Sequence, residues 1–178
     1  MSNVSNVSST NQIETEDLTI NGSMSISLKF AQLQMKQAES AKKKAQDYMA
    51  KIEDSQKEQK EIADMIAKAR ELQNKAKAGQ GDCSGDNKAS YMPDDMVKFF
   101  NDHGLSYDNK GEDNRHNVEE WDYNIKSLTN YQESKSNSTQ TLMVYVQDFI
   151  GQYNTYTQGA MSAISEAKQA FQAILNKV

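Results

Sequence analysis

The chain has 178 residues, a net charge of −5 and a mean hydropathy of −0.85, and 37% of its residues are hydrophobic. This length allows one domain, but the low hydropathy and the single proline favour long exposed helices over a thick globular core. The longest apolar run, Leu142 to Val146, is far shorter than the ~20 residues needed to cross a membrane, so we expect no membrane span.

Residues 1–23 are rich in Ser, Asn and Thr and carry three acids and no base. Such a segment has little to bury, so we predict a disordered leader. It lacks the charged start and apolar stretch of a secretory signal peptide. Two interpretations remain open, an ordinary frayed terminus and an export signal of another kind.

Residues 24–78 predict one long coiled-coil helix, because neither glycine nor proline interrupts them. Ser23 or Ser25 can cap its start, and Gly79 and Gly81 can end it. Twelve basic residues are interleaved with eight acidic ones, which favours a solvated helical face over a nucleic-acid surface. Its apolar positions repeat in heptads, first at Ala31, Met35, Ala38, Ala45, Met49 and Ile52, then at Ile62, Ile66, Ala69, Leu72 and Ala76.

Residues 79–123 carry eleven acids and four bases and predict an acidic cap between the long helices. We expect loops at 79–90 and 105–116 around a short helix, with Pro93 at its first position and Gly104 at its stop. Val118 and Trp121 precede the final helix in this interpretation. The residues predicted to pack together in the cap are Val97, Phe99, Phe100 and Trp121.

Residues 124–178 predict the second long coiled-coil helix, whose heptad register continues to the end of the chain. The stripe is wide, which indicates more than one neighbouring helix. The stretch Ser134–Thr141 is poor in helix formers, so we expect this helix to depend on packing. The predicted assembly interface comprises Leu142, Val146, Phe149, Ile150, Tyr153, Ala160, Ile164, Ala167, Phe171 and Ile174.

The two predicted long helices are equal in length and are joined by a connector. This arrangement predicts an all-α fold, a long antiparallel coiled-coil hairpin topped by a small acidic cap of helix and loop.

Residues with catalytic or metal-binding chemistry are sparse. Cys83 is the single cysteine and has no activating neighbour in sequence, and His103 and His116 lie outside any zinc-site spacing. A calcium loop centred on Gly111 fails, because a lysine occupies one ligand position and the final acid is missing. We therefore expect no catalytic residue, no cofactor and no metal, and we do not expect an enzyme.

Two stretches resemble a known family. The short helix reads YMPDDMVKFFNDHGL from Tyr91 to Leu105, and a coiled-coil stretch runs from Ile125 to Tyr153. Together with the leader and the two long helices, they resemble type III secretion needle-tip and filament proteins, especially the EspA/SseB filament branch. The second stretch also resembles the C-terminal helix of V-antigen-like tip proteins.

This resemblance implies a secreted structural subunit of a needle tip or filament, located outside the bacterial cell or on its surface. Its partners would be further copies of itself, the needle subunit, the translocon proteins and a dedicated secretion chaperone. The leader would be the uncleaved export signal. The alternative is a cytoplasmic coiled-coil adaptor or secretion chaperone that binds a partner helix.

Overall fold

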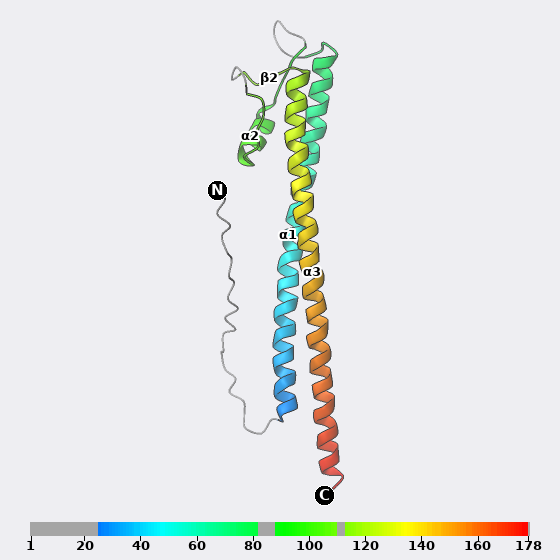
Figure 1. Ribbon diagram of the computed structural model, residues 1–178. Coiled ribbons are helices and arrows are strands. Elements are labelled where there is room, and N and C mark those ends of the chain that lie inside the picture. The colour runs from blue at the N-terminus through cyan, green and yellow to red at the C-terminus, as the bar shows by residue number, and fades with distance from the viewer. Residues whose placement is uncertain (1–24, 82–87, 110–112, 178) are drawn as a thin grey trace, which may run out of the picture. The chain divides into compact units, whose positions relative to one another are not determined.

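The computed structural model describes residues 25–81, 88–109 and 113–177 (Figure 1). The predicted leader, Cys83 and Gly111 lie outside the described residues. The elements in chain order are α1 (Ile26–Lys77), β1 (Ser90–Tyr91), α2 (Asp94–Asp102), β2 (Arg115–His116) and α3 (Val118–Leu175). The long helices α1 and α3 pack against each other, so the predicted all-α hairpin is confirmed.

The chain divides into two compact units. The central unit is Ala38–Asn154, and the terminal unit combines 1–37 with 155–178, of which 25–37 and 155–177 are described. In the central unit, residues with higher numbers on α1 contact residues with lower numbers on α3. The pairs Tyr48–Phe149, Ser55–Thr139 and Gln73–Val118 show this order. The two helices are therefore antiparallel there.

Both ends of α1 follow the predicted capping signals. The Ser25 hydroxyl accepts a 3.3 Å hydrogen bond from the backbone N–H of Leu28, which satisfies one of the unpaired donors at the helix start. At the other end, Gly79 adopts a φ of +68°, and the N–H of Gln80 donates to the Lys75 carbonyl at 2.9 Å. This glycine-dependent turn ends the helix.

The short helix α2 begins one residue later than predicted. Pro93 has extended backbone, with a ψ of 150°, and its carbonyl accepts hydrogen bonds from the N–H groups of Met96 and Val97. Pro93 is therefore the N-cap residue instead of the first helical residue. The stop at Gly104 is as predicted, since Gly104 has a φ of +62° and the Leu105 N–H donates to the Phe100 carbonyl at 2.8 Å.

The sequence interpretation placed only loops on either side of α2, whereas the structure adds a two-stranded antiparallel sheet. Ser90 of β1 lies opposite His116 of β2, and Tyr91 lies opposite Arg115. Each strand has two residues, which is too short for an alternating pattern to reveal it.

Helix α3 begins at Val118, six residues before the predicted boundary at 124. Asn117 caps it, because its side-chain oxygen accepts hydrogen bonds from the N–H groups of Glu119 and Glu120. The Glu120 carboxylate in turn accepts a 2.8 Å hydrogen bond from the Asn117 N–H, which completes a capping box. Val118 and Trp121 thus belong to the first turns of α3 and do not precede it.

The core of the central unit lies where α1, α2 and the start of α3 meet. Phe99, Phe100 and Trp121 are buried together there, and Val97 packs against them. A polar relay crosses this core, because the Trp121 indole N–H donates to the Ser90 hydroxyl, which donates to the Leu72 carbonyl. The remaining buried members of the cluster are Ile62, Ile66, Ala69, Leu72, Ala76, Met92, Met96 and Leu128.

Farther along α3, a polar contact replaces apolar packing. Thr139 is buried, and its hydroxyl lies 2.7 Å from the Ser55 hydroxyl and accepts a 2.8 Å hydrogen bond from the Gln59 amide. The stretch Ser134–Thr141, which is poor in helix formers, is helical throughout. These cross-helix hydrogen bonds support it where its own propensity is low.

The terminal unit has a different interior. Its buried cluster consists of Ala31 from α1 and of Ala160 and Ala163 from α3. A Cβ added at Gly159 would lie 3.2 Å from the Gln34 side-chain oxygen, so small residues let the helices approach closely. No large side chain contributes to this cluster among the residues that the structure describes.

Candidate assembly surface

The predicted assembly interface divides into two sets in the central unit. Leu142, Val146 and Phe149 are half-buried, and the Phe149 ring stacks on Tyr48 of α1 with centroids 5.6 Å apart. Ile150 and Tyr153 are exposed, at 45% and 36%. The first set therefore includes a contact within the hairpin, whereas the second set leaves apolar surface uncovered.

The same division appears in the terminal unit. Ala160 is fully buried in the alanine cluster and Ala167 is half-buried. Ile164, Phe171 and Ile174 expose 49%, 63% and 62% of their surfaces. Of the predicted residues in this unit, the small ones are thus covered, and the large ones remain exposed.

Helix α1 contributes exposed apolar side chains to the terminal unit that the sequence interpretation did not assign to an interface. Ile26, Phe30 and Leu33 are exposed at 85%, 48% and 42%. Their signal in the sequence is a cluster of large apolar residues just outside the heptad row through Ala31 and Met35. On α3, Met161 and Leu175 add to the exposed set at 65% and 59%. We call these residues, with Ile164, Phe171 and Ile174, the terminal apolar surface.

The terminal apolar surface is the strongest candidate for a binding site. Burying a large aliphatic or aromatic side chain contributes roughly 1.5–3 kcal/mol, and a buried alanine contributes much less. Among residues 25–37 and 155–177, the three buried residues are alanines, while large apolar side chains with more to gain from burial are in water. Exposed apolar surface on this scale is typical of sites where another protein binds.

A polar cluster joins three elements of the central unit. The Tyr131 hydroxyl of α3 donates a hydrogen bond to the Glu58 carboxylate of α1 and lies 3.0 Å from His103 Nδ1, at the end of α2. Lys135 Nζ lies 2.8 Å from the second Glu58 oxygen. Burial acts to raise the pKa of Glu58, but the hydrogen bonds from Lys135 and Tyr131 outweigh it and hold the pKa below its ordinary value.

This cluster has a structural role, because it holds the end of α2 against the two long helices. Burial and the hydrogen bond to Glu58 raise the pKa of Tyr131, and the hydrogen bond to Glu58 raises the pKa of Lys135. Both side chains therefore keep their protons, and Glu58 keeps its charge, near neutral pH. Lys135 and Glu58 form an ion pair between α3 and α1, and the hydrogen bond from Tyr131 to Glu58 supports it.

His116 is the most buried titratable group in the described residues of the cap. Its side chain is 1% exposed, and its ring packs edge-on against Trp121 with centroids 5.1 Å apart. Burial lowers the pKa of His116, so the imidazole is neutral near pH 7. Its Nε2 has no hydrogen-bond partner among the described residues. The contact with Trp121 assigns His116 to the core of the cap.

Within 25–81, 88–109 and 113–177, no three His, Cys, Asp or Glu side chains come together as a metal-binding group. In the same ranges, no helix combines the length and the hydropathy that a membrane crossing requires.

No family model, curated protein or solved structure matches this chain.

Proposed function

We propose that this chain is a secreted structural subunit of a type III secretion needle tip or filament. In this role it assembles with further copies of itself outside the cell and links the needle to the translocon. One observation carries the self-assembly part of the proposal, namely that large apolar side chains of the terminal unit lie in water around a cluster of three alanines. The secretion part is supported by the resemblance of 91–105 and 125–153 to that family.

Self-assembly through α-helices suits the chemistry of this surface. Two helices that each expose a row of Ile, Phe, Leu and Met can pack against the same surface of another copy and bury it. Before export, the same exposed row would need protection from aggregation, which is the task proposed for a dedicated chaperone. Outside the cell, other copies take the place of the chaperone.

The assembly is tested by placing charges on the terminal apolar surface. Ile164→Asp with Phe171→Asp puts two carboxylates where a second copy would bury them, at a cost of several kcal/mol. Both side chains are exposed in the single chain, so its helix content should stay the same. We expect sedimentation velocity to show oligomers for the wild type and monomers for this variant.

The matched control is Ser162→Asp with Gln169→Asp. These two positions are also exposed, are also seven residues apart on α3 and receive the same added charge. The control should assemble like the wild type. Equal association of the wild type and the Ile164/Phe171 variant would refute the proposed assembly surface.

Export is tested separately. Deleting residues 2–20 should remove the protein from the culture supernatant of its native bacterium under secretion-inducing conditions, while the amount inside the cells stays the same. An intact chain that stays in the cytoplasm under these conditions, with or without the deletion, would instead favour the adaptor or chaperone interpretation.

A further inference from the structure

A second surface, in the central unit, combines aromatic rings with lysines. Tyr48 of α1 packs between two aromatic residues of α3, with ring centroids 5.4 Å from Tyr145 and 5.6 Å from Phe149. Lys51 Nζ lies 4.9 Å from the centroid of Tyr48, and Lys44 Nζ lies 5.4 Å from that of Phe149. We call these five residues the aromatic–lysine face.

In the described part of the chain, the two lysines of this face contact aromatic rings and no acidic side chain. Within the described residues, neither Lys44 nor Lys51 has a carboxylate within ion-pair distance, and Tyr145 is 46% exposed. The neighbouring Asp148 accepts a hydrogen bond from Gln152 on the same helix. The face therefore presents positive charge beside apolar ring surface, and it suits an acidic partner that also carries aromatic side chains.

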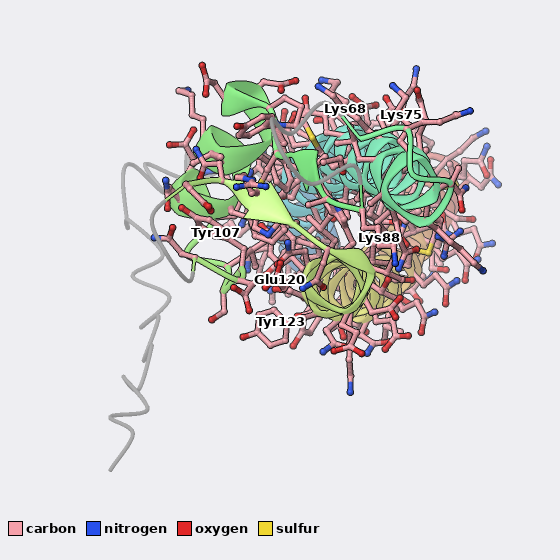
Figure 2. All side chains as sticks on the ribbon, turned by 90° about the horizontal axis from the view of Figure 1, so that it is seen from above. Lys68, Lys75, Lys88, Tyr107, Glu120 and Tyr123 are labelled. Carbon is pink, nitrogen blue, oxygen red and sulfur yellow. The ribbon has the colours of Figure 1, made fainter. Side chains whose placement is uncertain are left out.

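A groove with these complementary properties lies at the other end of the central unit. It has a volume of about 760 Å³, and its walls include Tyr107, Asp108, Glu119, Glu120 and Tyr123. Figure 2 shows Tyr107, Glu120 and Tyr123 on one side of the start of α3, whereas Lys68 and Lys75 belong to α1. Tyr123 is 50% exposed, and Glu119 is also exposed. We call this the tyrosine–acid groove.

The two surfaces of one chain cannot meet. Gln73 marks the level of the groove on α1, because its amide donates to the Val118 carbonyl and to Asp122. From Tyr48 to Gln73, a helical rise of 1.5 Å per residue separates the face from the groove by roughly 38 Å. An interaction between them therefore needs two copies of the chain.

We propose that the aromatic–lysine face of one copy binds the tyrosine–acid groove of the next. Lys44 and Lys51 meet the carboxylates of Glu119 and Glu120, and the tyrosine rings of the groove supply further surface for the ammonium groups. Charge complementarity favours a second copy of the chain as the partner, because the segment 24–78 has a surplus of bases and 79–123 has a surplus of acids. This inference rests on the proposed function, because it assumes that the chain assembles with itself.

The arrangement gives the assembly a direction. The two partners use different surfaces, so the contact is head-to-tail and leaves one free face and one free groove at the ends. Such a contact repeats along an open chain unless its rotation closes a ring. The terminal apolar surface can then hold neighbouring chains together through a separate contact.

The test uses the full-length protein and three double variants. Lys44→Glu with Lys51→Glu reverses the charge of the aromatic–lysine face. Glu119→Lys with Tyr123→Lys places two positive charges in the tyrosine–acid groove. Lys60→Glu with Arg70→Glu is the control, because both residues are exposed and the change in net charge equals that of the face variant. Circular dichroism first checks that all three keep the helix content of the wild type.

We expect the face and groove variants each to associate at least about tenfold more weakly than the wild type by sedimentation velocity, because like charges then meet. The control should keep the association of the wild type. An equimolar mixture of the face and groove variants should regain it, since each new charge then meets its opposite. Salt near 1 M, where the Debye length is about 3 Å, should weaken the wild-type contact.

The outcomes separate this inference from the proposed function. The head-to-tail contact would be overturned if the wild-type oligomers resisted salt and the face and groove variants associated as strongly as the wild type. Self-assembly itself would then still stand. A mixture that stays as weak as its two components would also overturn it. A wild type that remains monomeric at every concentration would overturn both proposals.

Discussion

The Trp121 indole nitrogen donates a 2.8 Å hydrogen bond to the Ser90 hydroxyl, although 31 residues separate the two in sequence. Both side chains are completely buried, and the same hydroxyl donates to the Leu72 carbonyl at 2.9 Å. Three segments of the chain thus depend on one small hydroxyl group. It fastens β1 to both long helices.

We predict that Ser90→Ala lowers the free energy of unfolding by about 1–3 kcal/mol, because the Trp121 N–H and the Leu72 carbonyl both lose a buried partner. Urea denaturation followed by circular dichroism measures this change. Ser162→Ala is the control, because Ser162 is exposed on α3 and its loss should change stability by less than about 0.5 kcal/mol. Equal midpoints for the two variants would contradict the role of the relay.

The polar cluster around Glu58 predicts a pH dependence. The Glu58 pKa is below its ordinary value of 4.5 in the folded chain, so the unfolded chain binds the proton more readily. The stabilisation by Glu58 is therefore complete above about pH 4.5 and is lost as the pH falls through the lower folded-state pKa. We expect the wild type to be more stable than Glu58→Gln at neutral pH, with the difference shrinking in acid.

Thermal unfolding at a series of pH values measures that difference. Glu133→Gln serves as the comparison, because Glu133 is exposed on α3 and forms no ion pair among the described residues. Its difference from the wild type should stay small and nearly constant. A Glu58→Gln difference that grew as the pH fell below 4.5 would show that the carboxylate is not stabilised as described.

Two glycines should respond to alanine in opposite directions. Gly151 lies inside α3 with open space around its Cβ position, so Gly151→Ala should stabilise the helix by about 0.5–1 kcal/mol. Gly79 has equally open space but a φ of +68°, so Gly79→Ala should destabilise the chain by about 1 kcal/mol or more. Melting temperatures check both, and a shift of the same sign for the two would contradict the backbone argument.

Helix ends were predictable where a local signal was strong. Ser25, Gly79 and Gly104 lie at helix ends close to the predicted positions, because capping and left-handed backbone strongly favour particular residue types. The predicted start of α3 was wrong by six residues. Asn117 and Glu120 form a capping box, and their spacing in the sequence could have indicated the true start. The acidic, loop-like residues before it concealed that signal.

The candidate site was predictable only in part. A heptad row shows that a residue packs against a helix, but it does not show whether that helix belongs to the same chain. Phe149 of the predicted interface contacts Tyr48 of its own chain, whereas Ile164 and Phe171 of the same interface remain exposed. The difference depends on which side of α3 faces α1, and only the folded hairpin determines that. The short β1–β2 sheet was likewise beyond any periodic signal.

The cluster of three alanines in the terminal unit also determines how this unit responds to dilution. If association buries the large side chains that the single chain leaves in water, ordering and binding of this unit become one equilibrium governed by mass action. Its melting temperature then rises with protein concentration. The region around Trp121 already has its apolar partners within the same chain.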